Sequence, residues 1–391
     1  MTTPESVELE FRARFAATPR AFRSPGRVNL IGEHTDYNMG YVLPAAIDRA
    51  IYFAVAPRTD ELCSVHALDV GEDIEFALRD LKRSDRGWPN YLQGVVDQLL
   101  RAGCRLSGFN CVFGGDIPIG AGVSSSAALE AGLAFSLNRV FALGIESLSL
   151  VKLAQRAENE FVGVRCGIMD QYANVFGRKD HVLRIDCRSL EHAYSPFDSR
   201  VASIVLFDSG VSHSLASSEY NRRREECAEG VAVIRKRCPQ VASLRDASAA
   251  LVEESAQWMT APVYRRCRYV VEENARVLRA CAHLEKGDLH SFGALMKQTH
   301  DGLSGLYEVS CHELDFLVDA VREDPAVYGA RLMGAGFGGC TINVVRSDAV
   351  EDVCERTAAS YRNAFNIDLR AYVMSIGSGT SEIPVRTNST R

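Results

Sequence analysis

The sequence lacks the features that mark membrane-spanning, secreted and nucleic-acid-binding proteins. Its longest apolar runs, such as residues 203–207, have the length of a strand and fall far short of the ~18 residues of a membrane span. No basic segment followed by an apolar one stands at the N-terminus, which predicts no secretory signal and a cytoplasmic location. The formal net charge of −6, from 44 basic and 50 acidic residues, provides no whole-chain attraction to nucleic acid or to anionic lipid. We therefore expect neither a nucleic-acid nor a membrane partner.

Disulfide, zinc and P-loop motifs are also missing. The twelve cysteines are scattered between Cys63 and Cys354 without any Cys-x-x-Cys pair, so we expect free and mostly buried thiols and no zinc site. No Gly-Lys pair occurs anywhere in the chain, which excludes the P-loop of the common nucleotide-binding proteins.

What is present is the composition of an ordinary globular protein, with 47% hydrophobic and 24% charged residues. At ~150 residues per domain, 391 residues favour two domains. Strand patterns occur at residues 27–31, 50–56, 109–113, 182–185, 203–207, 341–345 and 369–374. Helical patterns occur at residues 92–100, 150–161, 217–236, 262–284 and 312–322. Because strands and helices mix without regular alternation, we predict an α+β fold. The pattern becomes richer in helix near residue 200, which predicts an N-terminal domain at 1–200 and a C-terminal one at 201–391.

The strongest local signal is a glycine- and serine-rich segment at residues 114–130. A strand runs into Gly120 and Gly122, whose missing Cβ atoms let backbone N–H groups approach an anion. Ser124, Ser125 and Ser126 follow and can cap a helix whose positive end faces that anion. The segment predicts a phosphate site; an ordinary glycine-rich turn with a serine cap is the alternative.

A second glycine cluster at residues 331–340 formally contains the dinucleotide fingerprint Gly-x-Gly-x-x-Gly. That fingerprint must open a helix, whereas the residues that follow, 341–345, have a strand pattern. We therefore expect a glycine-rich hairpin that closes over a ligand, with tight backbone packing as the alternative.

Polar side chains crowd the end of the first strand and a later short helix. Glu33, His34 and Asp36 lie in a loop dense in donors and acceptors, which suits the hydroxyls of a sugar; a metal site and a solvated loop are the alternatives. Arg27 lies on the apolar strand, where an unpaired guanidinium would be costly, so we expect a carboxylate or phosphate partner. Asp170 follows apolar and glycine residues and suits a dry site, although a plain helix cap would also explain it.

Taken together, these segments resemble the GHMP small-molecule kinases. Residues 26–44 resemble the signature of galactokinase-type sugar kinases, residues 115–127 the nucleotide loop, and residues 329–340 the third glycine motif, in the family's order. Residues 166–171 add a fourth match, and the likeness covers about residues 10–375. Val123 and Met333 depart from the usual Leu and Thr. The resemblance implies ATP-dependent phosphorylation of the anomeric hydroxyl of a hexose, on a two-domain α+β scaffold with its active site in the interdomain cleft.

The resemblance also implies roles for individual residues. Asp170 would be the base for the C1 hydroxyl, and Arg27 would neighbour that carboxylate and the transferred phosphoryl group. The implied sugar contacts are Glu33, His34, Asp36, Gly167 and Tyr220. The implied nucleotide contacts are Gly120, Gly122, Ser124, Ser125 and Ser126, with Trp88 and Tyr91 near adenine, although packing explains these two aromatics equally well. Ser126 and Glu158 would hold Mg²⁺.

Galactose is the expected substrate, with ATP as co-substrate and no protein partner implied. Kinases for N-acetylgalactosamine, arabinose or galacturonate are the alternatives on the same scaffold, because specificity depends on pocket shape. A catalytically silent sugar and ATP sensor is the alternative from a different class.

Overall fold

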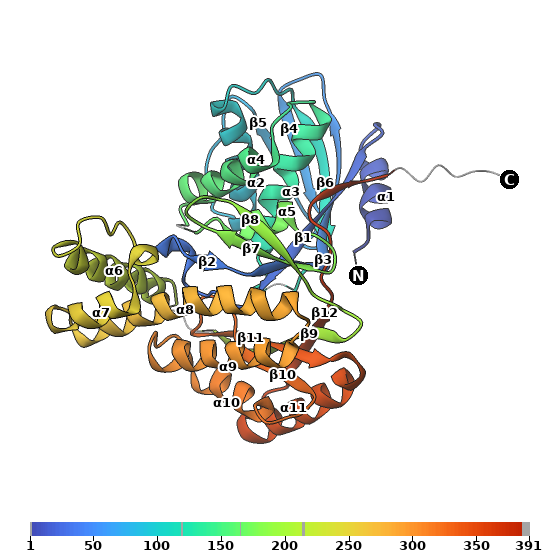
Figure 1. Cartoon of the computed structure of the whole chain (residues 1–391). Coiled ribbons are helices and arrows are strands. Elements are labelled where there is room, and N and C mark those ends of the chain that lie inside the picture. Colours follow the sequence, from blue (N-terminus) through green and yellow to red (C-terminus); the bar gives the residue numbers. More distant parts are fainter. Residues whose placement is uncertain (1, 119, 165, 213–215, 385–391) are drawn as a thin grey trace.

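The strand predicted around Arg27 belongs to a six-stranded sheet in the first half of the chain (Figure 1). The computed structural model describes residues 2–118, 120–164, 166–212 and 216–384. The sheet has the order β13-β1-β3-β6-β4-β5, and its neighbouring strands are antiparallel except for β4 with β6. Its strands are β1 (Arg20–Asn29), β3 (Pro44–Pro57), β4 (Leu62–Ala67), β5 (Glu72–Ala77), β6 (Phe109–Gly115) and β13 (Ser381–Ile383).

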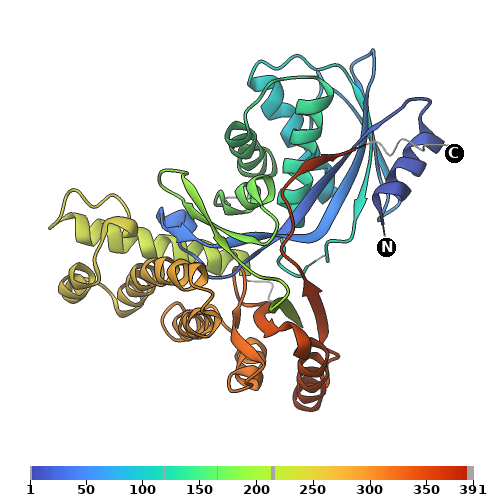
Figure 2. The same ribbon diagram turned by 45° about the vertical axis from the view of Figure 1, so that its right-hand side comes forward.

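Helices cover both faces of this sheet. Figures 1 and 2 show α1 on one face and α2 to α5 on the other, where α3 packs on β1 and β3. A π-helical segment, Ala157–Val162, directly continues α4 and ends at Gly163. The helices are α1 (Pro4–Arg14), α2 (Gly87–Arg101), α3 (Ser125–Val140), α4 (Ser147–Arg156) and α5 (Met169–Phe176).

A four-stranded antiparallel sheet, in the order β10-β11-β9-β12, organises the second half. Along β9 the side chains alternate, so that Ile204 and Leu206 join the core shared with the first half while Val205 and Phe207 pack against α10 and α11. The strands are β9 (Ala202–Ser212), β10 (Val327–Leu332), β11 (Gly338–Arg346) and β12 (Arg370–Met374). The helices are α6 (Ala216–Arg235), α7 (Ala249–Ser255), α8 (Ala261–Glu285), α9 (Leu289–Gly305), α10 (His312–Val321) and α11 (Val350–Phe365).

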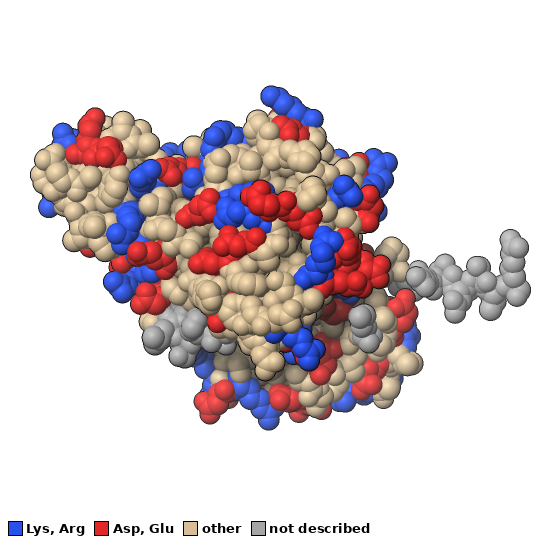
Figure 3. Space-filling view, turned by 90° about the horizontal axis from the view of Figure 1, so that it is seen from below, with Lys and Arg blue, Asp and Glu red and all other residues tan. Residues whose placement is uncertain are grey.

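A small three-stranded sheet lies between the two halves. It consists of β2 (Tyr41–Val42), β7 (His181–Asp186) and β8 (His192–Pro196). Figure 1 shows it between the first-half sheet and α8, and both β2 and β8 contact α8. On the face seen in Figure 3, basic and acidic side chains are interspersed without an extended area of one sign. Within the described part of the chain, no helix has the length and apolar character needed to cross a bilayer.

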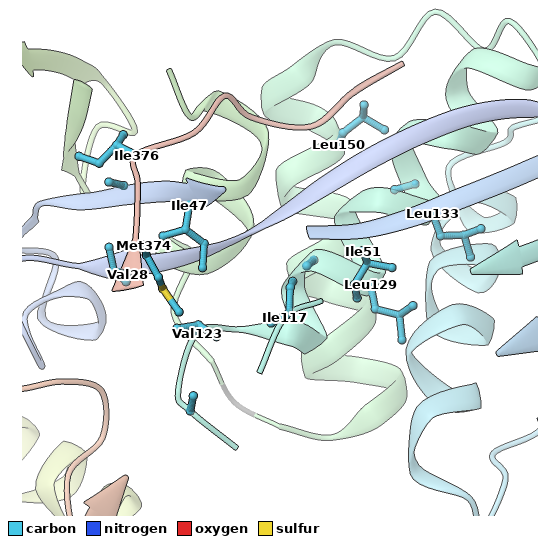
Figure 4. Packing of buried hydrophobic residues seen from close by; sticks show 14 of the residues in the cluster. Val28, Ile47, Ile51, Ile117, Val123, Leu129, Leu133, Leu150, Met374 and Ile376 are labelled. Atoms are coloured by element: carbon cyan, nitrogen blue, oxygen red, sulfur yellow. The ribbon is translucent and has the colours of Figure 1, made fainter. Parts of the chain in front are cut away.

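One hydrophobic core runs through both halves. Figure 4 shows Met374 and Ile376, from the end of the chain, beside Val28, Ile47 and Val123 of the first half. All twelve cysteines are free thiols and seven are buried, as expected.

The α+β class and the predicted strands are confirmed, with differences at β1, at strands that the sequence did not show and at the end of the chain. β1 begins at Arg20 rather than at residue 27, because a bulge between Pro25 and Arg27 carries the strand through a proline that reads as a strand breaker. The hairpin of β4 and β5 was not predicted. The end of the chain does not stay in the second half, since Ser381–Ile383 pairs with β1; three residues are too few to show a pattern in the sequence. The division at residue 200 itself stays a prediction.

Gly132 lies where α3 packs closely against the first-half sheet. A Cβ atom there would lie 2.4 Å from Phe53 Cε2 and 2.7 Å from Ser24 Cβ, both of them buried. We expect Gly132→Ala to lower the free energy of unfolding by ~1–3 kcal/mol, despite the better helix propensity of alanine. Gly305→Ala in α9 is the matched control: an added Cβ meets nothing within 4 Å, so stability should stay equal or rise. Urea denaturation of both variants checks this, and equal stabilities would contradict it.

Candidate active site

The loop after β1 is tied to the glycine-rich hairpin of the second half. The Glu33 carboxylate accepts hydrogen bonds from Arg331 Nη2 at 3.1 Å and from the Gly334 amide at 2.8 Å. Arg331 is fully buried and also donates to the carbonyl oxygens of Asn29 at 2.5 Å and Leu30 at 2.8 Å. This loop is therefore buried rather than solvated, and Glu33 is already engaged by a cation.

Arg27 and Asp170 form the ion pair that the apolar strand around Arg27 predicted. Arg27 Nε and Nη2 donate to the two carboxylate oxygens of Asp170, each at 2.8 Å, and Nη1 donates to the Gly122 carbonyl at 2.6 Å. Burial lowers the pKa of Arg27, but the attraction of Asp170 outweighs it and the net shift is upward. The two parallel hydrogen bonds hold the Asp170 carboxylate in one plane. The same guanidinium also binds the nucleotide loop, through the Gly122 carbonyl.

Ser124 does not cap the helix that follows it, which corrects one expectation. Its backbone is left-handed, with φ of 58°, and its side chain makes no capping hydrogen bond. Instead Ser124 Oγ donates to Asp170 Oδ2 at 2.5 Å. A capping residue normally has an extended backbone, and the left-handed backbone of Ser124 does not provide that geometry.

Gly167 makes room for the Asp36 carboxylate. A Cβ atom at position 167 would lie 1.8 Å from Asp36 Oδ2, so no other residue fits without moving Asp36. Burial raises the pKa of Asp36 to about 6, and the nearby carboxylates of Asp170 and Glu33 add to the increase.

An aromatic group surrounds His34. Its Nδ1 shares a hydrogen bond of 2.8 Å with the Tyr37 hydroxyl, which in turn is 2.8 Å from the Tyr307 hydroxyl. The Tyr220 ring packs 5.7 Å from the imidazole. Burial lowers the pKa of His34 to about 4, so the ring is neutral at pH 7.

These residues enclose a cavity of about 180 Å³ between the two halves. Every predicted catalytic and sugar-contact residue lines it, together with five residues that the sequence analysis did not single out as site residues. The predicted residues are Arg27, Glu33, His34, Asp36, Gly167, Asp170 and Tyr220, and the additional ones are Tyr37, Cys166, Met169, Gly334 and Ala335.

A larger cavity of about 770 Å³ lies against the first-half sheet and the start of α3. Trp88, Tyr91, Ser125 and Ser126, four of the residues for which the resemblance implies nucleotide contacts, line it. Trp88 also packs on Phe113, with ring centroids 5.4 Å apart. The same side chain therefore lines the cavity and contributes to core packing. Gly120, Gly122 and Ser124 are not among the residues that line this cavity. Gly120 and Gly122 have positive φ angles of 83° and 71°.

Two buried carboxylates lie next to one another beside Asp170. Gln171 Nε2 donates to Glu158 at 2.8 Å and to Glu130 at 3.3 Å, and the other oxygen of Glu130 has no hydrogen-bond partner among the residues that the structure describes. Burial first, and then the neighbouring carboxylates, raise the pKa of both glutamates. The pair thus has oxygen ligands and excess negative charge, the chemistry that Mg²⁺ seeks, so Glu158 fits a bound cation.

Sequence reasoning missed Arg331 and Glu130. Arg331 opens the glycine-rich segment, and a fully buried arginine requires partners; its only sequence signal is a charge on an apolar strand, as for Arg27. Glu130 lies on the buried side of α3 among alanines and leucines, and that apolar context was the available signal.

Comparisons with known proteins agree with this geometry. Residues 9–57 match a family described as the galactokinase galactose-binding signature, residues 90–178 match the GHMP kinases N terminal domain, and residues 278–363 match GHMP kinases C terminal. The galactokinase of Roseiflexus sp. (strain RS-1) is 44% identical over 95% of this chain and 95% of its own length. The galactokinase of Thermotoga maritima is 40% identical over 92% of this chain and 99% of its own.

Solved structures give the same result. The Lactococcus lactis galactokinase complexed with galactose superposes with a TM-score of 0.92 and 34% identity, covering 98% of this chain and 100% of that one. The Methanococcus jannaschii mevalonate kinase, with a TM-score of 0.63 and 17% identity over 93% of this chain and 99% of that one, shares the fold.

Proposed function

The chain belongs to the galactokinases of the GHMP kinase family, and on that premise we propose that it transfers the γ-phosphoryl group of ATP to the C1 hydroxyl of galactose. The observation that carries the proposal is the cavity in which Asp170 and Arg27 face Glu33, His34 and Asp36 across a space of about 180 Å³.

The smaller cavity holds the sugar. Asp36 accepts hydrogen bonds from sugar hydroxyls as a carboxylate, and the imidazole of His34 offers one more polar contact. The Tyr220 ring packs against His34 and closes one side. Glu33 acts through Arg331 and the Gly334 amide, which fix the hairpin over the sugar.

The larger cavity holds ATP, with its base near Trp88 and Tyr91 and its phosphates toward Ser125 and Ser126. These serines begin α3, whose N-terminal N–H groups attract phosphate. In the transfer, the C1 oxygen bonds to the γ-phosphorus while the bond from that phosphorus to the bridging oxygen breaks and ADP leaves. Asp170 accepts the hydroxyl proton, and Arg27 offsets charge on the moving phosphoryl group.

Mg²⁺ completes the proposal, with Ser126 and Glu158 as the residues that would hold it. A bound Mg²⁺ neutralises phosphate charge, and it keeps several waters, so two protein oxygens suffice. Ser126 lines the ATP cavity, and Tyr91, which lines the same cavity, has its pKa raised by burial and by the charge of Glu158. A cytoplasmic location and the absence of protein partners stay predictions.

ADP release tests the function directly. Purified protein with Mg-ATP is assayed on galactose, N-acetylgalactosamine, glucose, mannose, arabinose and galacturonate. We expect galactose to give the highest kcat/KM. Turnover on another sugar alone would show that this sugar, and not galactose, is the substrate. Sugar binding without turnover on any of the six would favour a catalytically silent sugar and ATP sensor.

Galactose affinity should depend on the protonation of Asp36. With a pKa of about 6, the ionised fraction falls about tenfold between pH 7 and pH 5, and a protonated carboxyl is the weaker acceptor for sugar hydroxyls. We therefore expect the KM for galactose to rise about tenfold from pH 7 to pH 5. Asp36→Asn is the control, because its KM should be high and nearly independent of pH. A constant KM in the unmodified protein would remove Asp36 from sugar binding.

The Mg²⁺ requirement should depend on Glu158. Activity is expected to disappear on addition of EDTA, and Glu158→Gln to need at least about tenfold more Mg²⁺ for half-maximal rate, since a neutral amide binds the hard cation more weakly. Glu160→Gln is the control on the same helical segment, because Glu160 is exposed and hydrogen-bonded to Gln98 at 2.9 Å instead. An identical Mg²⁺ titration for the two variants would show that Glu158 holds no metal.

A further inference from the structure

The nucleotide loop has a left-handed backbone at three alternate positions. Gly120, Gly122 and Ser124 have positive φ angles of 83°, 71° and 58°. Glycine adopts this backbone region at no steric cost, whereas the Cβ atom of any other residue makes it unfavourable. A serine therefore occupies a position at which glycine would relieve strain. Replacement by glycine would, however, also remove the Ser124 hydroxyl.

The hydroxyl of Ser124 is directed to the catalytic carboxylate and not to the nucleotide side. Ser124 is not among the residues that line the ATP cavity, although Ser125 and Ser126 both are. Its side chain makes no capping hydrogen bond to α3. The hydroxyl donates instead to Asp170 Oδ2, at 2.5 Å. The contact that the structure gives Ser124 therefore differs from the nucleotide contact that the resemblance implies.

The two residues before Ser124 are attached to the same ion pair. Arg27 Nη1 donates to the Gly122 carbonyl at 2.6 Å, and the Arg27 amide donates to the Val123 carbonyl at 3.0 Å. The Val123 side chain is buried in the core that both halves share (Figure 4). Three consecutive loop residues are therefore fixed against the pair of Arg27 and Asp170, and this anchoring holds the Ser124 hydroxyl in place.

The hydrogen bonds on Asp170 are distributed unequally between its two oxygens. Oδ2 accepts from Arg27 Nη2 at 2.8 Å and from Ser124 Oγ at 2.5 Å. Within the part of the chain that the structure describes, Oδ1 accepts only from Arg27 Nε, at 2.8 Å. Each carboxylate oxygen has two lone pairs, so both acceptor positions of Oδ2 are used and one position of Oδ1 is free. Since Asp170 lines the sugar cavity, a substrate hydroxyl can use the free position on Oδ1.

We propose that Ser124 is a positioning residue for the transfer: its hydroxyl occupies Oδ2 of Asp170, so that the C1 hydroxyl of the sugar donates to Oδ1 and passes its proton there. The inference rests on the proposed function and deepens it. Without the Ser124 hydroxyl, water or the C1 hydroxyl donates to Oδ2 in part of the complexes, and those complexes are misaligned for transfer. The loss falls on kcat, because neither substrate loses a contact of its own.

Two variants of the full chain test this role. Ser124→Ala removes the hydroxyl, and Ser124→Gly also relieves the left-handed backbone. We expect both to lower kcat about tenfold, with the KM for ATP and the Kd for galactose within about twofold of the unmodified protein. The Tm of Ser124→Gly should equal or exceed that of Ser124→Ala, which separates lost activity from lost folding. Ala142→Gly is the matched control, because Ala142 is exposed, has a φ of 51° and lines neither the sugar nor the ATP cavity; its kcat should be unchanged.

A double-mutant cycle shows whether Ser124 acts through Asp170. In the Asp170→Asn background, Ser124→Ala should change kcat less than about twofold, because the carboxylate that it positions is already gone. A further tenfold loss in that background, a kcat within twofold in both single variants, or a higher KM for ATP at unchanged kcat would overturn the proposal. The last result would assign Ser124 to the nucleotide and leave the proposed kinase function intact. Inactivity of the unmodified protein on every sugar would overturn the proposed function itself, which no result on the variants alone does.

Discussion

Asp170→Asn is expected to lower kcat about a thousandfold or more while galactose binds within about threefold of the unmodified protein. The asparagine has the same shape, so it keeps the geometry but cannot accept the hydroxyl proton. It also places an NH₂ group against one of the two N–H groups that Arg27 donates at 2.8 Å, which weakens the fork. Steady-state kinetics and calorimetric galactose binding separate the two effects.

The matched control for this variant is Asp116→Asn. Asp116 also pairs with an arginine, Arg49 at 3.1 Å, but it lies outside the sugar cavity. Its kcat should stay within about twofold. Near-normal turnover in Asp170→Asn, or an equal loss in both variants, would show that the Asp170 carboxylate does not receive the proton.

Arg27→Gln is expected to lower kcat about a hundred- to thousandfold. Removal of the guanidinium takes away a charge that offsets the phosphoryl group, a loss of the size seen for oxyanion donors. It also removes the two hydrogen bonds that hold the Asp170 carboxylate in place.

Two further variants distinguish this role from a structural one. Arg49→Gln removes the arginine of the Asp116 pair and should leave kcat unchanged. Arg27→Lys keeps the positive charge but loses the paired hydrogen bonds to Asp170, and we expect it to recover part of kcat. Equal losses of kcat in Arg27→Gln and Arg49→Gln, or no recovery in Arg27→Lys, would mean that the charge of Arg27 does not assist the transfer.

The sequence predicted contacts of the candidate site where a charged residue lies in an apolar segment. Arg27 on its strand required a partner, and the structure supplies Asp170 through two hydrogen bonds. The same reasoning applied to Arg331 would have predicted its burial against Glu33. The sequence could not identify the partner of either arginine. Arg27 and Asp170 are far apart in the chain, as are Glu33 and Arg331, and only the folded structure brings them into contact.

Local rules failed where a stronger tertiary interaction competed. Ser124 has the residue type of a helix cap, yet its hydroxyl goes to Asp170 and its backbone turns left-handed. The strand β13 has no apolar run, and only its pairing with Ala21, Phe22 and Arg23 defines it. Both cases depend on contacts between distant parts of the chain, which no short pattern encodes.

The site of phosphorylation is the measurement that tests the account most directly. Galactose labelled with ¹³C at C1 is incubated with the protein and Mg-ATP, and the product is observed by ¹³C and ³¹P NMR. The account predicts a single phosphate monoester whose phosphorus couples to the labelled C1. Phosphate attached to another carbon, or ATP hydrolysis without any sugar phosphate, would contradict the placement of the C1 hydroxyl between Asp170 and the γ-phosphate.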